Sequence, residues 1–521
     1  MEPVSAELVY FREDGRRHTL LTIAGPLFMP MLGYASVKLH VAVHDRAGQK
    51  VGAVDHVLDA DGAVFIDSRE LARAVPGLPE EGALVVWVTP TSRLPDQARA
   101  DYSGAGSMVD WFSDDGQLAS LHSDQTLRQG TKPIEWTEVV FREEPGSPTS
   151  LVIVNGPERQ PERGLELVVR NVDGAERAAT YDDAMAPFAV HRVVLGDVFP
   201  ELTTFCRGAE ASLRGRFGAK GIFTRPYVMT EGQLISAYHG GDRYHMAPIP
   251  RALHRTFPSA DATAVPREVL VTVGQKEMNP AYAVHGPGLT TRLHLFQSHG
   301  AIDDDFPIDV TAYDRDGRVV AHRDRWAVAP RHGATTVDVA ELVGGARFEG
   351  HLALRFSDRP VEAFPRRLQA LLEYRTPVSV ARMMLWSDRW NAPDRLSARV
   401  PHRALYRVFP PGPLTTTLAI SNASVSADYD REASYTIRLW TDGDVWAVEG
   451  TLPPHGTRVA SIDELFPDRP AGVHALAIVE SDFDLASMQL TRDARSGVVS
   501  AEHLMAVIAV EDGRQVLPAG A

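Results

Sequence analysis

The amino-acid sequence predicts an all-β protein, built as four tandem antiparallel β-sandwich (or barrel-like) domains with a single short helical turn between the two sheets of each. Short runs in which apolar and polar residues alternate are separated by Gly and Pro turns, and helical periodicity is rare. A similar order of elements recurs four times along the 521 residues. This pattern is typical of sandwiches with about seven or eight strands each.

The recurring order is clearest between Trp440 and Asp482, which reads as strand, tight turn, strand, one short helical turn and strand. Its tight turn contains Asp442-Gly443, where glycine can adopt a positive φ. The helical turn is expected at Glu464–Pro467, where it would cross between the two sheets. Pro467 is expected to end it, because proline disfavours the α conformation in the residue before it.

The first two blocks of the chain show the same order of elements. Ser36–His44 alternates apolar and polar residues as a half-buried strand does, Asp45–Gly48 follows as a turn, and Ala83–Val88 supplies a strongly apolar strand. In the second block, Leu165–Arg170 is the strand that precedes the turn at Val172–Gly174. Both blocks therefore predict the unit seen near the C-terminus.

The third and fourth blocks open with closely similar segments. Arg251–Pro258 and Arg403–Pro410 are identical at six of eight positions, which coincidence seldom supplies. Within the third block, Ile308–Tyr313 alternates before the turn at Asp314–Gly317. We therefore expect these two similar segments to be the starts of two further units.

Equivalent turn residues set the length of the unit. Asp45, Asp173, Asp314 and Asp442 are separated by 128, 141 and 128 residues, by subtraction of their numbers. This spacing far exceeds the roughly 20–50 residues of solenoid repeats, so each unit is expected to be a domain with its own core. The predicted domains are residues 1–134, residues 135–249, residues 250–400 with an inserted segment from about 275 to 305, and residues 401–521.

One known family has a similar order of elements. The succession of strand, turn, strand, Pro453–Thr457, Ile462–Leu465 and a strand ending at Ser481-Asp482 resembles the small β-sandwich of the sensory rhodopsin transducer family. The resemblance covers one repeat at a time and rests on spacing and residue character. It implies a β-sandwich that works by binding and assembly rather than by catalysis, and it assigns no functional residues here.

Composition argues against several functional classes. The formal charge of −15 disfavours a nucleic-acid-binding surface, which needs clustered Lys and Arg. Cys206 is the only cysteine, which excludes an intramolecular disulfide and a zinc site built on several thiolates. The first residues lack a signal-peptide pattern, and no apolar run approaches the roughly 18–20 residues that span a bilayer. We therefore expect a cytoplasmic protein that contacts neither nucleic acid nor membrane.

Candidate ligand-binding residues cluster just before each new unit. An Asp recurs at three of these junctions and follows a His or Trp by two or three residues, whereas the fourth unit ends differently, at Glu502-His503. Such junctions could form clefts lined by imidazole, carboxylate and aromatic groups. Alternatively, the Asp caps a turn and the aromatic side chains fill the seam between domains, and recurrence with the repeat favours this architectural interpretation. The candidates are His122, Asp124, Tyr238, His239, Asp242, Tyr244, His245, Trp386, Asp388 and Trp390.

No complete cofactor motif is present, and a divalent metal is the one candidate cofactor. Two His six residues apart with an Asp between them, namely His239, Asp242 and His245, can converge on zinc, nickel or iron if the loop folds back. No His-Glu-x-x-His helix fixes that geometry. Cys206 beside Arg207 is a second chemical candidate, because a neighbouring guanidinium lowers a thiol pKa, although a free Cys is more often simply buried.

These observations predict a non-catalytic binding or assembly protein, whose partner could be a protein, a small molecule or a polymer. The rival hypothesis is an enzyme with a polar or metal-assisted site at the junction of the second and third units. In that hypothesis His239, Asp242, Tyr244 and His245 serve as acid–base or metal-binding groups. Self-association through exposed sheet edges is a third hypothesis.

Overall fold

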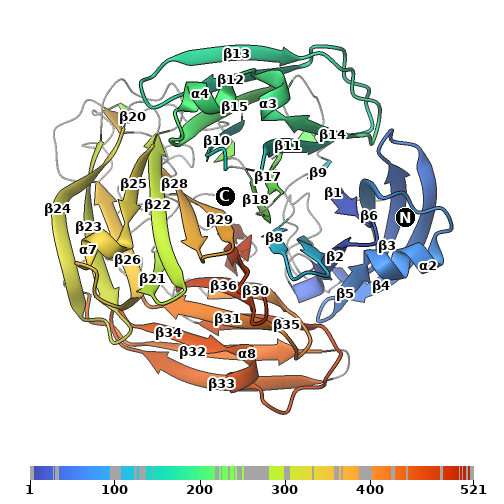
Figure 1. Cartoon of the computed structure of the whole chain (residues 1–521). Coiled ribbons are helices and arrows are strands. Elements are labelled where there is room, and N and C mark those ends of the chain that lie inside the picture. The colour runs from blue at the N-terminus through green and yellow to red at the C-terminus, as the bar shows by residue number, and fades with distance from the viewer. Residues whose placement is uncertain are drawn as a thin grey trace.

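In a computed structural model of the chain, β-strands form most of the regular structure (Figure 1). The strands build antiparallel sheets that face each other in pairs, so the predicted all-β class with antiparallel sandwiches is confirmed. The structure describes residues 5–516 apart from 27–28, 30–33, 94–106, 123–125, 128–136, 145, 218–221, 224–225, 233–234, 240, 243–248, 251–280, 298–305, 331–333, 357–362, 365–367, 387–401, 424–428, 442–443, 482–484, 504, 507–508 and 512–513.

The first two sandwiches share one strand order. The first has layers in the orders β4-β3-β6-β1 and β5-β2-β7-β8, and the second has β13-β12-β15-β10 and β14-β11-β17-β18. The elements of the first are β1 (Ser5–Arg12), β2 (Arg17–Ala24), β3 (Tyr34–Asp45), β4 (Lys50–Asp59), β5 (Ala63–Asp67), α2 (Ser68–Ala74), β6 (Glu81–Arg93), β7 (Ser107–Ser113) and β8 (Leu118–His122). Those of the second are β10 (Thr137–Phe141), β11 (Thr149–Val154), β12 (Leu165–Arg170), β13 (Glu176–Tyr181), β14 (Val190–Val194), α3 (Leu195–Val198), α4 (Leu202–Cys206), β15 (Ala211–Phe217), β17 (Tyr227–Glu231) and β18 (Ile235–His239).

The third and fourth sandwiches keep this order. In the third, β21 also pairs with β22, so its strands form one continuous sheet, β24-β23-β26-β21-β22-β28-β29, with β25 beside β22. The fourth has layers β33-β32-β35-β30 and β34-β31-β36-β37. The elements of the third are β21 (Ala281–Gly286), β22 (Leu289–Gln297), β23 (Phe306–Asp314), β24 (Val319–Ala329), β25 (Thr335–Asp338), α7 (Val339–Leu342), β26 (Phe348–Phe356), β28 (Leu368–Arg375) and β29 (Val380–Trp386). Those of the fourth are β30 (His402–Val408), β31 (Leu414–Ser421), β32 (Ala433–Trp440), β33 (Val445–Leu452), β34 (Thr457–Ser461), α8 (Ile462–Leu465), β35 (Ala475–Ser481), β36 (Ala486–Asp493) and β37 (Val499–His503).

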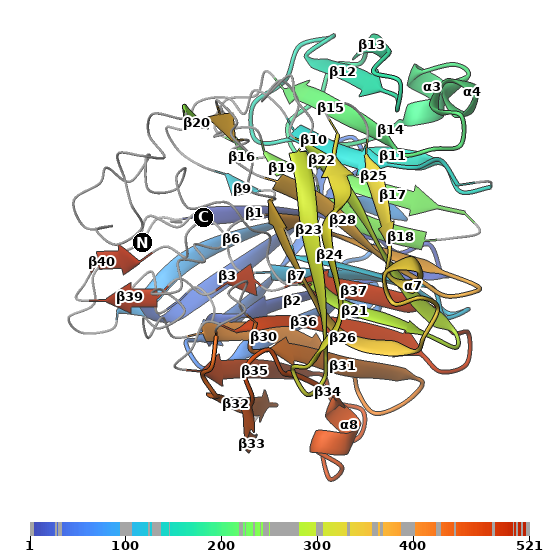
Figure 2. The ribbon, with the colours of Figure 1, turned by 90° about the vertical axis from the view of Figure 1, so that its left-hand side faces the viewer.

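Several two- or three-residue strands accompany the sandwiches. They are β9 (Thr126–Leu127), β16 (Ile222–Phe223), β19 (Gly241–Asp242), β20 (Ile249–Pro250), β27 (Ala363–Phe364), β38 (Met505–Ala506), β39 (Ala509–Glu511) and β40 (Arg514–Val516). Four of them, β16, β20, β39 and β40, lie toward the left side of the molecule in Figure 2.

The start of the third sandwich differs from the sequence expectation. The segment Arg251–Pro258, expected to open the third unit, lies outside the described residues, as does the turn at Asp442-Gly443. The strand that takes the place of β30 in the third sandwich is β21. Both β21 and β22 fall within the stretch that sequence analysis treats as an insertion, yet they supply the first and second strands of this sandwich. The four predicted domain boundaries stay predictions.

The predicted short helical turn is present as α8, which begins at Ile462, two residues earlier than expected. Ser461 accepts a hydrogen bond from the Glu464 backbone, and the Glu464 carboxylate accepts one from the Ser461 backbone, which makes a complete capping box. α2, α3 and α7 occupy the same place before the sixth strand of their sandwiches. A helical turn at this crossover is therefore a feature of every sandwich.

The four sandwiches form a closed ring (Figure 1). We call β8, β18, β29 and β37 the axial strands, because they are the last strands of the four sandwiches and surround the centre. β8 packs beside β18, β18 beside β29, β29 beside β37, and β37 beside β8. The layers that contain the axial strands are called the inner sheets, and the other layers the outer sheets. In the third sandwich the inner sheet is the β25-β22-β28-β29 part of the continuous sheet. The first and last sandwiches therefore meet, although no linker joins them directly.

Three of the four inner sheets pack an apolar face against the core of the preceding sandwich. Tyr227, Met229 and Ala237 of the second sandwich join the first core, and Leu371 and Met384 of the third join the second core. Met488, Leu490 and Ala501 of the fourth join the third core. Such head-to-tail contacts close into a ring when the rotation between units allows it. The ring is completed where the first sandwich meets the fourth, a contact that we call the closing seam.

A tight turn docks in the same way at two seams. Gly48 of the first sandwich lies against the carbonyl oxygen of Pro187, and Gly317 of the third lies against that of Pro454. Beside them, the Val190 amide donates to the Arg46 carbonyl at 3.0 Å, and the Thr457 amide donates to the Arg315 carbonyl at 3.0 Å. Both glycines have positive φ, 87° and 83°, and neither leaves room for a β-carbon. Both turns therefore require glycine, because any other residue would collide with the neighbouring sandwich.

We expect Gly48→Ala to destabilise the protein by about 2–4 kcal/mol, because it adds a collision with Pro187 to the cost of a positive φ. Gly77→Ala is the matched control, since Gly77 has φ 78° but no atom within 4 Å of an added β-carbon. The control should lose only about 1–2 kcal/mol. Urea unfolding of both variants checks this, and equal losses would contradict the docking role of the turn.

Candidate functional site at the ring axis

Three axial strands end at one equivalent position: His122, His239 and His503 each lie four residues along the strand from the pair that closes the β7–β8, β17–β18 or β36–β37 hairpin. In the third sandwich Met384 lies at this position, and β29 continues for two more residues to Trp386. Two of the sequence-predicted candidates, His122 and His239, therefore share one register around the axis. His503, which sequence analysis set apart as a different ending, shares this register. The pairs are His122 with Met108, His239 with Tyr227, Trp386 with Gln369, and His503 with Met488.

Just beyond the axial strands the chain crosses from the inner sheet to the outer sheet. β9 pairs with β1, β19 with β10, and β38 with β30, so each short strand extends the outer sheet of its own sandwich beside the first strand. Among the described candidates, His122, His239 and Trp386 therefore lie at the ends of axial strands, and Asp242 lies in β19. A strand end that recurs with the unit is a physical reason for candidates that recur with it, in line with the architectural interpretation.

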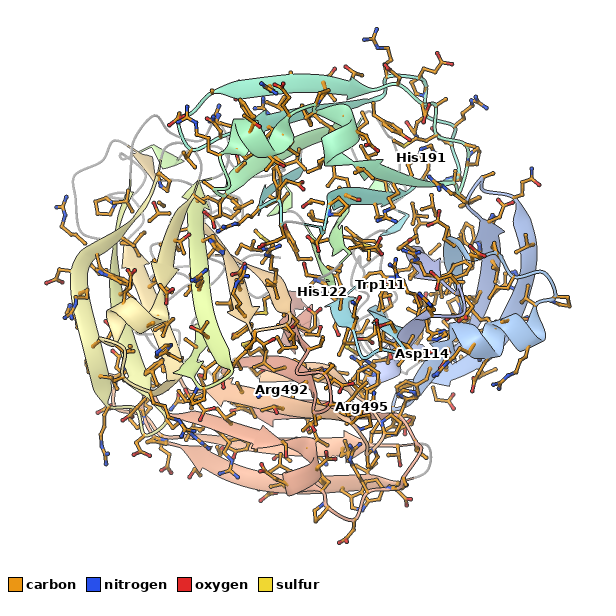
Figure 3. All side chains as sticks on the ribbon, viewed as in Figure 1. Trp111, Asp114, His122, His191, Arg492 and Arg495 are labelled. Atoms are coloured by element: carbon orange, nitrogen blue, oxygen red, sulfur yellow. The ribbon has the colours of Figure 1, made fainter. Side chains whose placement is uncertain are left out.

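His122 takes part in the closing seam. Its side chain is 5% exposed, and its Nδ1 lies 2.9 Å from Oε1 of Glu502, which is also 5% exposed. Figure 3 shows His122 near the centre of the ring, on β8. The pair joins the first and fourth sandwiches, so the position of His122 serves assembly of the ring.

A second buried ion pair lies in the closing seam. Nη2 of Arg407 contacts Oδ1 of Asp110, and the Ser120 hydroxyl donates to the same oxygen at 2.5 Å. The Arg407 guanidinium also stacks on Phe409, 3.6 Å from the ring centre. Burial raises the pKa of Asp110 to about 6 and lowers the pKa of Arg407 to about 10. Sequence reasoning missed this pair, because no local pattern marks an Asp and an Arg that meet across 297 residues.

Tyr238, another predicted ligand-binding residue, is used inside the second sandwich. Its hydroxyl donates to the carbonyl of Val140 at 3.0 Å, and its side chain is 1% exposed. Burial raises the pKa of Tyr238 above its ordinary value. The described contacts therefore give this tyrosine a structural position.

The seam between the second and third sandwiches holds a buried charge network. Arg382 contacts Glu373 at 3.1 Å and Glu144 at 2.8 Å, and Arg375 contacts the same two carboxylates. Burial alone would raise the pKa of Glu373, but contacts with His294, Arg382 and Arg375 outweigh burial and hold the pKa well below the usual range. The network ties the second sandwich to the third.

We expect Glu373→Gln to lower the free energy of unfolding by about 3–5 kcal/mol at pH 7, because it leaves buried guanidinium groups without a charged partner. The folded pKa of Glu373 lies below its ordinary 4.5, so the carboxylate stabilises the protein above that pH and loses this effect as the pH falls below it. The difference between the variant and the natural chain should therefore shrink below about pH 4.5.

Urea unfolding across a pH series measures this difference. Glu480→Gln is the matched control, because Glu480 pairs with Arg438 in a partly exposed bridge and should cost less than about 1 kcal/mol. A loss for Glu373→Gln that stays constant down to acidic pH would contradict the assigned network.

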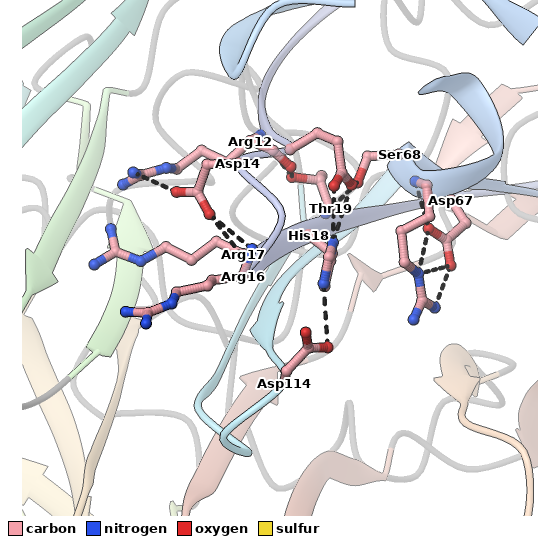
Figure 4. A network of polar contacts seen from close by, with 11 residues as sticks. Arg12, Asp14, Arg16, Arg17, His18, Thr19, Asp67, Ser68 and Asp114 are labelled. Carbon is pink, nitrogen blue, oxygen red and sulfur yellow. Dashed lines mark hydrogen bonds and ion pairs between the residues drawn. The ribbon is translucent and has the colours of Figure 1, made fainter. Parts of the chain in front are cut away.

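A further polar network lies where the β1–β2 turn meets the β7–β8 turn (Figure 4). Nδ1 of His18 lies 3.0 Å from Glu13, and its Nε2 lies 3.2 Å from Asp114. Ser68 donates to Glu13 at 2.6 Å and accepts a hydrogen bond from the Thr19 amide. Ser68 thus contacts a carboxylate instead of the imidazole, so the group lacks the serine–histidine contact that activates a nucleophile. It fastens two turns of the first sandwich together.

The remaining sequence candidates are only partly described. Asp124, Tyr244, His245, Asp388 and Trp390 lie outside the described residues, and for His239, Asp242 and Trp386 only the backbone is described. Within the described residues, no three His, Cys, Asp or Glu side chains are placed to hold a metal ion. The metal site proposed from His239, Asp242 and His245 therefore stays a prediction.

Two further sequence expectations bear on chemistry and membranes. Cys206 is 2% exposed, and burial raises the pKa of its thiol to about 11, so the suggestion that Arg207 activates it is wrong. Arg207 instead pairs with Asp173 at 2.8 Å. In the part of the chain that the structure covers, no helix is long and apolar enough to cross a membrane.

Comparison with known proteins finds only remote likenesses. No family model and no curated protein matches the chain. Two crystal structures of a glycosyl hydrolase family 2 member from Bacteroides cellulosilyticus share 7% and 8% sequence identity over 57% and 50% of this chain, with TM-scores of 0.12 and 0.10. The chain spans only 32% and 26% of those hydrolase chains. The CupB6 tip adhesin from Pseudomonas aeruginosa shares 8% identity over 46% of this chain and 90% of the adhesin chain, with a TM-score of 0.11. At these scores the likenesses carry no argument about function.

Proposed function

We propose that the chain is a non-catalytic binding or assembly protein, whose closed ring brings the ends of the four axial strands together around one axis. The observation that carries the proposal is that the four axial strands pack around one axis, with His122, His239 and His503 at one register and Trp386 two residues further along its strand. A partner that contacts the ends of the axial strands would meet all four sandwiches together. The ring would supply the rigidity that limits the ordering cost of binding.

The buried polar groups at the axis support this proposal. His122 is engaged with Glu502 and Asp110 with Arg407 across the closing seam, and Tyr238 is engaged with a backbone carbonyl inside the second sandwich, so these side chains serve structural contacts. Recognition is then assigned to the crossover segments beyond the strands. Tyr244, His245 and Trp390 are the sequence candidates there, and they combine aromatic area with polar groups, as binding surfaces commonly do.

A binding screen of the full chain tests the proposal. Thermal-shift measurements with a panel of metabolites and soluble polysaccharides, together with affinity capture of proteins, should identify a partner. We expect Tyr244→Ala with His245→Ala, and separately Trp390→Ala, to weaken binding by about tenfold or more, as truncation of an aromatic anchor does. Recovery of the bound ligand in a chemically altered form would contradict a non-catalytic role.

The matched control for this screen lies at the opposite end of an axial strand. Arg492 near the end of β36 and Arg495 in the turn after it lie at the other end of the β36–β37 hairpin from His503. Figure 3 labels both arginines. Arg492→Ala with Arg495→Ala should leave binding unchanged. A loss of binding in the control but not in the crossover variants would place the site at the other end of the axis.

A further inference from the structure

We infer that the ring opens reversibly at the closing seam while its other three seams remain closed. This inference goes beyond the proposed function and does not depend on it. It concerns the contact between the first sandwich (β1–β8) and the fourth (β30–β37), which Figure 1 shows between the blue and the orange strands. Three properties distinguish this seam from the others: its chain connectivity, its apolar contacts and its buried charges.

Connectivity is the first difference. The first and second, second and third, and third and fourth sandwiches follow one another along the chain, so their partners stay close even when a contact breaks. The first and fourth sandwiches are joined only through the whole ring. His122 and Glu502, which meet across the closing seam, are separated by 380 residues. Closing this seam carries a loop-closure entropy that the neighbouring seams largely avoid.

Apolar packing is the second difference. At the other three seams, side chains of one inner sheet merge with the core of the preceding sandwich. At the closing seam, the apolar contacts form two small groups that are separate from both cores. One group contains Ala24, Met108, Leu405, Leu476 and Ile478, and the other contains Leu20, Leu118, Phe409 and Val498. The apolar contacts of this seam are therefore not an extension of either core, so the seam can open without exposing the core of the first or the fourth sandwich.

The third difference is a buried ion pair whose two members both keep polar atoms without a hydrogen-bond partner in the described part of the chain. Within the described residues, Arg407 uses Nη2 for Asp110 and Ser120, while its Nε and Nη1 have no hydrogen-bond partner. Oδ2 of Asp110 and Nδ1 of His474 likewise have none there. Burying such groups without partners costs free energy that opening would recover through hydration.

The seam between the second and third sandwiches shows the opposite arrangement of buried charge. Arg382 in that seam is as buried as Arg407, but it contacts two carboxylates, Glu144 and Glu373. Arg407 has a single carboxylate partner in the described part of the chain. A buried ion pair of this kind stabilises a contact only when its remaining donors and acceptors are satisfied. The closing seam is therefore the contact with the lowest cost of opening.

Paired spin labels on the full chain test this inference. Val57, Val319 and Val445 lie on the outer strands β4, β24 and β33 and are 68%, 58% and 59% exposed, so cysteine at these positions disturbs no core. Val57→Cys with Val445→Cys reports on the closing seam, and Val319→Cys with Val445→Cys reports on the seam between the third and fourth sandwiches. Both pairs are placed in a Cys206→Ser background and measured by pulsed electron spin resonance in increasing urea.

We expect a second, longer distance to appear for the first label pair at urea concentrations below global unfolding, while the second pair keeps one distance. A simultaneous change in both pairs, or an earlier change in the second pair, would overturn the inference. No change in the first pair before global unfolding would overturn it as well.

A variant that replaces both members of the buried ion pair separates the contribution of charge from those of connectivity and apolar packing. Asp110→Leu with Arg407→Met replaces the buried pair by apolar side chains, which removes the unsatisfied groups. We expect the open fraction reported by the first label pair to fall by at least about fivefold. An open fraction that is unchanged or larger would contradict the assigned role of the charges, and the unsubstituted label pairs remain a test if this variant fails to fold.

Discussion

The structure depends on one packing arrangement: the outward face of an inner sheet is apolar and packs on the preceding sandwich, joining its core at three seams and forming separate apolar groups at the closing seam. Tyr227 illustrates the principle, since its ring packs edge-on against Trp111 at 5.4 Å and its hydroxyl donates to the carbonyl of Leu8. An inner sheet with two apolar faces cannot remain solvated on one side, so every sandwich needs a neighbour. Four such contacts, made head to tail, leave no uncovered inner sheet once the ring closes.

The same arrangement explains where the polar residues lie. A seam that forms between two folded sandwiches must also bury the ends of their strands and turns, so carboxylates and guanidinium groups become trapped there. Glu231 is an example: it is 5% exposed and contacts Arg12 at 2.9 Å and Arg17 at 3.7 Å across the first seam. Such pairs specify which surfaces fit together, while the apolar faces supply most of the free energy. A polar residue near the axis is therefore a weak indicator of catalysis in this fold.

The sequence predicted local structure well and long-range pairing poorly. Alternation in Ser36–His44 and the capping pattern Ser461–Glu464 depend on neighbours along the chain, so the strands and helical turns were predictable. The first two strands of the third sandwich were not, because the identity between Arg251–Pro258 and Arg403–Pro410 drew attention upstream, and the segment that holds β21 and β22 was interpreted as an insertion. The sequence pattern located His122 near a junction between units, but it could not identify its partner Glu502, which is 380 residues away along the chain.

The position of His503 shows what a three-dimensional register adds to a sequence pattern. By spacing alone, Glu502-His503 differed from the three junctions that carry an Asp, and it stood outside the candidate set. Strand pairing places His503 opposite Met488, just as His122 lies opposite Met108. Equivalence in this protein is defined by position in the sheet, because the linkers vary in length while the strand order is kept. Trp386 illustrates the same point, because it follows the sequence pattern of His122, yet strand pairing places Met384 at the register of His122.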